Sequence, residues 1–383
     1  MRFFKTCLTV LILMLSFSIN YGQSNLRKAN KQYELGAFNV AIKSYLKVLD
    51  RQPRNIQALG RLADCYRHLN NMREAEKHFS RLTEMRNVEP EHYLNYGHVL
   101  KALGQYDAAK RYYYKYAEKY PVAGNQYAES CNFAISKASL PPSTKVTNEF
   151  LNTGSADFSP TIYKDGKVIY ASSRRDIRSN DRNAPKLNSY GGNQLFITMR
   201  DANGFLKKPA LLRKNFGGTQ NEGPVAYSPD AKIVAVTRNN YVNGTRQIPT
   251  AGFELSLHIA EVTSNGDFTN IVPFPYNGSG YSTGFASFSP DGNELYFASD
   301  RPDGFGGFDI YVSQRIGNSW SAPENLGAVI NTQGNEITPF FNGTDLFFAS
   351  DWHFGFGGLD LFSSQKMTTG GWNQVLCRFV VIC

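Results

Sequence analysis

The stretch SPDGNELYFASDRPDGFGGFDIY, residues 289–311, joins two short apolar runs through a Gly-rich loop, and GTDLFFASDWHFGFGGLDLF, residues 343–362, repeats its main elements. The Asp-Gly and Asn-Gly pairs that precede the first run supply the positive φ angles of tight hairpin turns. The apolar runs are rich in aromatic residues, as β-strands are. The two stretches therefore predict a β-sheet motif that the chain uses more than once.

Four segments follow this plan, and they begin near residues 157, 221, 282 and 335. Most of them predict a strand, a tight turn, an apolar strand, a Gly-rich loop and a third strand; the second departs from the plan with Asp230-Ala231 at its first turn. A small antiparallel sheet repeated in this way is typical of propeller blades. Fourfold repetition favours an architectural role for the Gly-rich loops, where backbone must pass close to a neighbouring blade, over an active site.

Residues 289–301, SPDGNELYFASDR, resemble the repeat of TolB-type, WD40-like (PD40) propellers, and SPTIYKDGKVIYASSR and TPFFNGTDLFFASD are looser versions of it. The resemblance covers roughly residues 144–372. It implies an all-β propeller with about four blades in this sequence, and we expect the ring to be incomplete.

A second repeat precedes the blades, with a period of 34 residues. Small or turn-forming residues, alanines and aromatic residues each recur in register, which predicts one antiparallel helix pair per period. The stretches ELGAFNVAIKSYLKVLDRQP and ALGQYDAAKRYYYKYAEKYP resemble the tetratricopeptide repeat, over about residues 22–121, and a capping helix is expected over 122–138. The recurring positions are Gly36, Asn70 and Gly104, then Ala41, Ala75 and Ala109, and then Tyr45, Phe79 and Tyr113.

The first helices of such repeats line a concave groove, which is where a peptide would bind. The helical period places six residues on that face. A solvated face that serves only as a spacer is the alternative. The candidate groove residues are Asn30, Tyr33, Asp64, Arg67, His98 and Lys101.

The N-terminus predicts export, because Arg2 and Lys5 precede an apolar core over residues 7–17 and a polar exit. This pattern is typical of a secretory signal peptide with cleavage near Gly22. A retained membrane anchor is the alternative, although the apolar run is shorter than a membrane span. Cys65 and Cys131 fall in helical sequence and are expected to be buried thiols, with a disulfide as the other possibility.

Residues 24–121 carry 18 Lys and Arg against 10 Asp and Glu, so most of the formal charge of +9 belongs to the helical repeats. We expect acidic envelope proteins or peptide segments as partners. Nucleic acid is not expected, because an exported chain rarely meets it. No transmembrane span is expected in the mature chain.

No catalytic or metal-binding constellation emerges from the sequence. Residues 280–284 fit G-x-S-x-G, but another strand follows where a nucleophile elbow needs a helix. The six histidines show no metal-ligand spacing. We therefore expect no enzyme activity, no cofactor and no metal.

The order signal peptide, tetratricopeptide repeats and TolB-like propeller resembles OmpA-family envelope proteins of Bacteroidota, including the PorE type associated with type IX secretion. The resemblance implies a non-enzymatic periplasmic adaptor, associated with the outer membrane and linked to type IX secretion or to tethering of the outer membrane to peptidoglycan. The family's downstream peptidoglycan-binding domain has no counterpart here, so peptidoglycan binding is not expected of this chain. The alternatives are a soluble TolB-like periplasmic propeller acting in import or envelope integrity, and an enzyme whose propeller gates a catalytic domain.

The predicted domains are a signal peptide over 1–22, helical repeats with a capping helix over 23–140, propeller blades over 141–375 and an aberrant tail over 376–383. The stretch NQVLCRFVVIC, residues 373–383, which includes this tail, stands where the preceding blade leads into the next one. We therefore expect a C-terminally truncated product, with a propeller that is open or poorly stable by itself.

Overall fold

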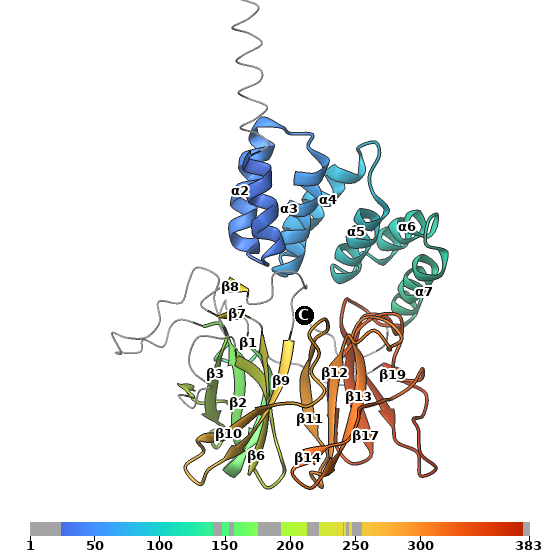
Figure 1. Ribbon diagram of the computed structural model, residues 1–383. Helices are drawn as coiled ribbons and strands as arrows, with labels where there is room; N and C mark the ends of the chain where they lie inside the picture. The colour runs from blue at the N-terminus through green and yellow to red at the C-terminus, as the bar shows by residue number, and fades with distance from the viewer. Residues whose placement is uncertain are drawn as a thin grey trace, which may run out of the picture. The chain divides into compact units, whose positions relative to one another are not determined.

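The structure, a computed structural model, describes residues 24–138, 140, 148–152, 157–174, 193–212, 222–239, 241–242, 245–246 and 255–377. The predicted signal peptide therefore lies outside the described residues. The chain divides into two compact units: Met1–Ser139 with Phe354–Gly358, and Leu140–His353 with Leu359–Cys383. The first is called the helical unit here and the second the propeller unit. Helices form the first part of the chain and strands the second (Figure 1).

The helical unit contains, within its described residues, a helix over 24–34 and six further helices. Two of the six begin with a proline, which is favourable in the first turn of a helix, and two others are capped by the side chains of Asn55 and Asn71. The bounds are α2 (Phe38–Arg51), α3 (Ile56–His68), α4 (Met72–Thr83), α5 (Pro90–Ala102), α6 (Tyr106–Ala117) and α7 (Pro121–Lys137).

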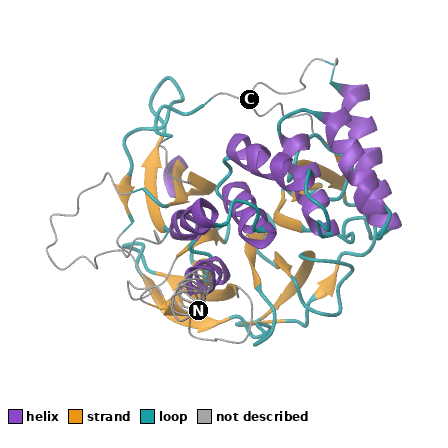
Figure 2. Cartoon of the chain, turned by 90° about the horizontal axis from the view of Figure 1, so that it is seen from above, coloured by secondary structure: helices purple, strands orange, loops and turns teal. Residues whose placement is uncertain are grey.

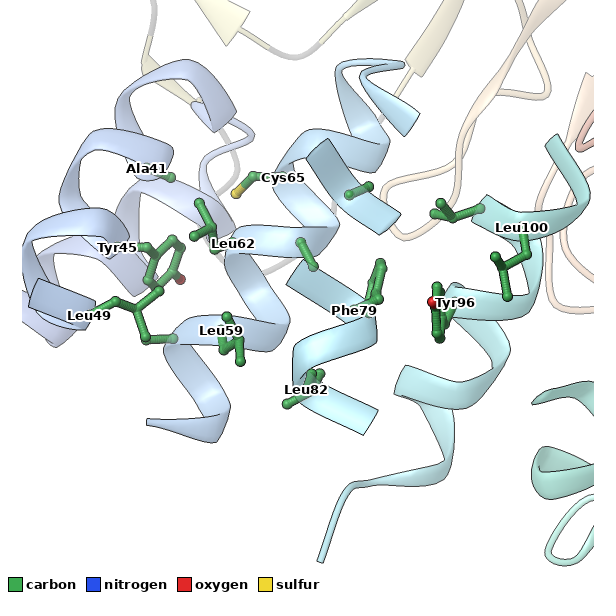
Figure 3. Close-up of a cluster of buried hydrophobic side chains, with 14 of the residues drawn as sticks. Ala41, Tyr45, Leu49, Leu59, Leu62, Cys65, Phe79, Leu82, Tyr96 and Leu100 are labelled. Atoms are coloured by element: carbon green, nitrogen blue, oxygen red, sulfur yellow. The ribbon is translucent and has the colours of Figure 1, made fainter. Parts of the chain in front are cut away.

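The 34-residue period corresponds to one helix pair, as predicted. Gly36, Asn70 and Gly104 each follow a first helix and each have a positive φ of 56–72°, a conformation that Gly and Asn adopt at low cost. The three alanines and the three aromatic residues of the period are all fully buried. They belong to one continuous core that links successive helix pairs, part of which Figure 3 shows from Ala41 to Leu100.

Cys65 and Cys131 are both buried and free in this core, which confirms that they act as small apolar groups rather than as a disulfide.

The described residues of the propeller unit form four small antiparallel sheets, here called blades 1 to 4; strands and loops make up this part of the chain (Figures 1 and 2). A separate two-stranded ribbon joins β7 (Tyr241–Val242) to β8 (Thr245–Arg246). Blade 1 holds β1 (Asp157–Tyr163), β2 (Lys167–Ser172), β3 (Gln194–Met199) and β4 (Ala210–Leu211); blade 2 holds β5 (Glu222–Tyr227), β6 (Ile233–Asn239), β9 (Leu255–Val262) and β10 (Phe268–Pro273); blade 3 holds β11 (Thr283–Phe288), β12 (Glu294–Ser299), β13 (Asp309–Ile316), β14 (Ser319–Trp320) and β15 (Glu324–Asn325); blade 4 holds β16 (Glu336–Phe341), β17 (Asp345–Ser350), β18 (Asp360–Gln365) and β19 (Leu376–Cys377).

Neighbouring blades pack face to face. β1 packs against β5, β5 against β11, and β11 against β16. Three apolar clusters fill the spaces between blades 1 and 2, blades 2 and 3, and blades 3 and 4. Together with the helical unit, this arrangement confirms the predicted fold class: an all-α tetratricopeptide-type region followed by an all-β, propeller-like region.

The Gly-rich loop of blade 3 lies where the sequence predicts a close approach of backbone. A Cβ atom added at Gly306 would lie 2.3 Å from the carbonyl oxygen of Thr332, in the segment that leads into blade 4. A Cβ atom at Gly307 would lie 2.4 Å from the Asn335 side chain. Any side chain at Gly306 would therefore require the backbone of the segment that leads into blade 4 to shift. At Gly358, the position of blade 4 that matches Gly307, an added Cβ would have no atom within 4 Å, so the close approach predicted for the second Gly-rich loop is not observed.

The loop that precedes blade 4 also surrounds a fully buried carboxyl group, Glu336. Its Oε1 accepts hydrogen bonds from Ser350 Oγ (2.6 Å) and Thr332 Oγ1 (2.7 Å), and its Oε2 accepts one from Thr332 N (2.8 Å). Burial raises the pKa of Glu336 to about 7, because loss of solvation outweighs the three hydrogen bonds and the Asp309 carboxyl adds a further upward shift.

We predict that this group makes the propeller unit less stable as the pH rises from about 4.5 to about 7. The folded-state pKa lies above the unfolded value, so the folded protein retains a proton that the unfolded chain releases, and stability is greatest below the unfolded pKa. Urea unfolding at several pH values should show a loss of about 2 kcal/mol over this range. Glu336→Gln should remove most of that loss. The control, Glu324→Gln at an exposed residue of β15, should retain it. If the stability of Glu336→Gln depends on pH in the same way as that of the wild type, Glu336 is not the group responsible.

Candidate peptide-binding face of the helical repeats

The six residues predicted from the helical period lie on the first helices of three successive pairs. Asn30 and Tyr33 lie on the helix over 24–34. Asp64 and Arg67 follow on α3, and the remaining two, His98 and Lys101, lie on α5. The structure joins some of them directly and separates others.

Asp64 is the centre of the first group, with only 6% of its surface exposed. Its Oδ1 accepts a hydrogen bond of 2.7 Å from Arg67 Nε. Its Oδ2 accepts one from the Tyr33 hydroxyl and lies 3.2 Å from Nε2 of His68. One buried carboxylate thus connects the first repeat to the second.

The pKa of Asp64 lies well below its usual value. Burial alone would raise this pKa, but the hydrogen bonds and charges of His68, Arg67 and Tyr33 outweigh that effect. The burial of Tyr33 and its bond to Asp64 raise the tyrosine pKa, so the hydroxyl keeps its proton and remains a donor. At neutral pH the group therefore holds an ionised carboxylate beside the Arg67 cation.

The helical-period reasoning missed His68 and two further neighbours. His68 stacks on Phe38, with ring centroids 4.4 Å apart and an interplanar angle of 1°. Arg61 lies over the Tyr33 ring, 5.0 Å from its centroid, and pairs with Glu34 at 3.5 Å. The spacing of four residues between Asp64 and His68 was a signal in the sequence, since residues i and i+4 share a helix face.

The other predicted residues contact the interior of the repeats. Asn30 Oδ1 accepts a 2.8 Å hydrogen bond from the Tyr45 hydroxyl. Nδ1 of His98 lies 3.0 Å from the Tyr113 hydroxyl, and its ring meets Tyr127 edge to face at 4.8 Å. Burial, with the positive charges of Arg67 and Lys101, lowers the pKa of His98 to about 3, so this ring is neutral at physiological pH.

Lys101 is only 2% exposed, and its Nζ donates a 2.8 Å hydrogen bond to Ser130 Oγ of α7. Lys101 and Asp64 therefore support the face from within, whereas the Arg67 side chain keeps 27% of its surface exposed. An arginine that is already oriented by a buried carboxylate can bind a carboxylate of a partner with little further loss of side-chain freedom. Binding of a peptide by these residues stays a prediction.

Among the residues that the structure describes, no group of three or more His, Cys, Asp or Glu residues has the arrangement of a metal site. None of the helices described is both long enough and apolar enough to cross a membrane.

Comparison with protein families supports the helical assignment. Two family models, both described as tetratricopeptide repeat, match residues 32–94 and 91–118. Residues 32–118 thus carry tetratricopeptide repeats, which the sequence predicted. A search of curated protein sequences finds no match.

Several solved structures are similar to part of this chain. The C-terminal tetratricopeptide-containing domain of an FK506-binding protein from Plasmodium falciparum is 20% identical, with 30% of this chain and 89% of that chain covered and a TM-score of 0.28. TolB from Acinetobacter baumannii is 16% identical over 57% of this chain and 42% of its own, with a TM-score of 0.33. An exo-β-1,3-galactanase from Clostridium thermocellum is 13% identical over 57% of this chain and 47% of its own, with a TM-score of 0.36. This chain spans less than half of the last two chains, and TM-scores this low carry no functional argument.

We predict that Asp64→Asn destabilises the helical unit by about 2 kcal/mol at neutral pH, because the Arg67 cation and the Tyr33 hydroxyl lose a buried anionic partner. The folded pKa of Asp64 is depressed, so its contribution is present above the unfolded pKa and is lost as the pH falls below about 4. Urea unfolding of the full chain, followed by the helical circular dichroism signal, measures both effects.

The matched control is Asp107→Asn on α6, where the side chain is 82% exposed and the expected change is within about 0.5 kcal/mol. Equal destabilisation by the two substitutions would contradict the prediction. So would a loss of unfolding free energy in Asp64→Asn that is the same at low pH as at neutral pH.

Proposed function

We propose that this protein is a non-enzymatic adaptor that binds other proteins through its helical repeats. The observation that carries the proposal is the presence of tetratricopeptide repeats over residues 32–118, whose first helices hold Arg67 in place through a buried carboxylate. Repeats of this kind present extended surfaces and have no need of an enclosed pocket. A partner with accessible carboxylates suits both the oriented arginine and the excess of basic residues in this region.

The proposal places the protein outside the cytoplasm. The charged N-terminal residues Arg2 and Lys5, followed by the apolar run over 7–17, are typical of a signal for export. In this proposal the exported chain is periplasmic and associates with the outer membrane. A role in type IX secretion, or in linking the outer membrane to peptidoglycan, follows only from the resemblance of the domain order to the OmpA family.

Photo-crosslinking in cells tests this proposal. A photo-reactive phenylalanine analogue is placed at Glu34, whose side chain is 65% exposed and lies beside Arg61. The same analogue at the exposed Lys47, on the second helix of the pair, is the control. We expect crosslinks from position 34 to a protein in the envelope fraction, and we expect Arg67→Glu to weaken them.

A full-length chain that yields no crosslinked protein at position 34, or identical products at both positions, contradicts binding at this face. Recovery of the unprocessed chain in the cytoplasm contradicts export independently of the crosslinks.

A further inference from the structure

A row of tyrosines and lysines covers the last repeat, outside the six residues predicted to line the groove. We call this the tyrosine–lysine patch. Tyr112, Tyr116 and Tyr120 follow one another at intervals of four residues, and so do Lys115 and Lys119, so each series lies along one side of α6 and of the turn that continues it. The patch consists of Tyr93, Tyr112, Lys115, Tyr116, Lys119 and Tyr120.

The first half of the patch places an ammonium group over two rings. Lys115 Nζ lies 5.4 Å from the ring centroid of Tyr93 and 5.1 Å from that of Tyr112. The two rings are 6.4 Å apart and inclined by 22°. Distances of this size are those of cation–π contacts. Lys115 itself is exposed, whereas both rings are half-buried.

The hydrophobic core of the helical unit fixes the ring of Tyr112. Tyr96 of α5 is 6% exposed, and its ring centroid lies 4.4 Å from that of Tyr112. On its other side Tyr96 packs against the fully buried Phe79, with centroids 6.0 Å apart (Figure 3). Tyr112 is therefore held by the same core that holds the repeats together.

The second half of the patch repeats the arrangement. The rings of Tyr116 and Tyr120 are 4.9 Å apart, and Lys119 Nζ lies 5.1 Å from the Tyr120 centroid. The Tyr120 hydroxyl donates a 3.2 Å hydrogen bond to Oε1 of Glu91, which ties this end of the patch to α5. Two lysine-on-tyrosine pairs thus lie next to each other in the sequence, the first on α5 and α6 and the second in the turn that follows α6.

We propose that the tyrosine–lysine patch binds an acidic segment of a partner protein that also carries aromatic or apolar side chains. This inference rests on the proposed function, since it assumes that the helical repeats bind proteins, and it adds a second contact region to the predicted groove. Tyrosine is enriched at the energetically dominant positions of protein interfaces because one ring offers both an apolar face and a polar hydroxyl.

The lysines determine the charge of the occupant. An ammonium already positioned over ring faces loses less side-chain freedom when it pairs with a carboxylate than a fully mobile lysine does. Residues 24–121 carry 18 Lys and Arg against 10 Asp and Glu, so the wider surface also attracts acidic chains. Salt screens both the pairing of these lysines with carboxylates and the attraction by the wider basic surface, so binding should be weaker at higher salt concentration.

The experiment uses the full-length chain and a fluorescently labelled copolymer of Glu and Tyr, with binding measured by fluorescence anisotropy at low and at high salt. The double substitution Lys115→Glu and Lys119→Glu should weaken binding at least about tenfold. Lys115→Gln with Lys119→Gln should have a smaller effect in the same direction, and it keeps the test valid if charge reversal perturbs folding. Tyr112→Phe should change little, whereas Tyr93→Ala, which removes a ring beneath Lys115, should weaken binding.

The matched control is Lys43→Glu with Lys47→Glu on α2, which changes the net charge equally at exposed positions of the first repeat. Equal losses in the patch and control variants would show attraction by net charge alone and overturn the proposal. Binding to vesicles of anionic lipid but not to the copolymer would overturn it in favour of a membrane surface. Crosslinking from position 34 does not depend on the patch. A positive crosslink without copolymer binding would therefore contradict this inference but not the proposed function.

Discussion

Burial of apolar surface between neighbouring repeats is the constraint on which both units of this protein depend. A single helix pair or a single four-stranded sheet has an apolar face that it cannot cover by itself. In the helical unit one continuous core runs from Ala29 to Cys131 and passes through every helix pair. In the propeller unit each apolar cluster is shared by two adjacent blades. Stability therefore arises at the contacts between repeats.

Equivalent residues of blades 3 and 4 show this dependence. Ile310 of β13 pairs with Ala298 and is fully buried, because blade 4 covers that face of blade 3. Leu361 of β18 pairs with Ala349 in the same register, yet it is 40% exposed. The sequence pattern is the same in the two blades. Ile310 belongs to the apolar cluster that blades 3 and 4 share, whereas Leu361 belongs to none of the apolar clusters among the described residues.

The same constraint shapes the candidate site. The alanine and aromatic residues of each period are buried in the core. Contacts at the candidate peptide-binding face therefore depend on polar residues of the first helices. Asp64 shows how a polar residue can be buried there, since its carboxylate has partners from two repeats. Arg67 depends on this carboxylate for its position. A partner that binds Arg67 would thus bind a residue that the packing of the repeats has already oriented.

Residue spacing was sufficient to predict the helix pairs and the blades, because both recur at fixed intervals. It was right about the close approach at Gly307 but wrong for the matching Gly358 of blade 4. It was not sufficient to predict which polar side chains become buried. Lys101 falls on the predicted groove face, but a hydrogen bond to Ser130, 29 residues later in the chain, accompanies its burial. The raised pKa of Glu336 likewise depends on the burial of its carboxyl group, which the repeat pattern did not indicate. The tyrosine–lysine patch was missed because Tyr93 and Lys115 come from different helices, and their contact depends on how those helices pack.

Hydrogen exchange, measured by mass spectrometry on the full-length chain under native conditions, tests the central claim most directly. If contact with neighbours supplies the stability, amides of β12 and β13, whose blade has a neighbour on each face, should exchange more slowly than amides of β17 and β18, although both strand pairs have the same register of hydrogen bonds. Equal protection of the two pairs, or slower exchange in β17 and β18, would contradict the account and show that each blade is stable by itself.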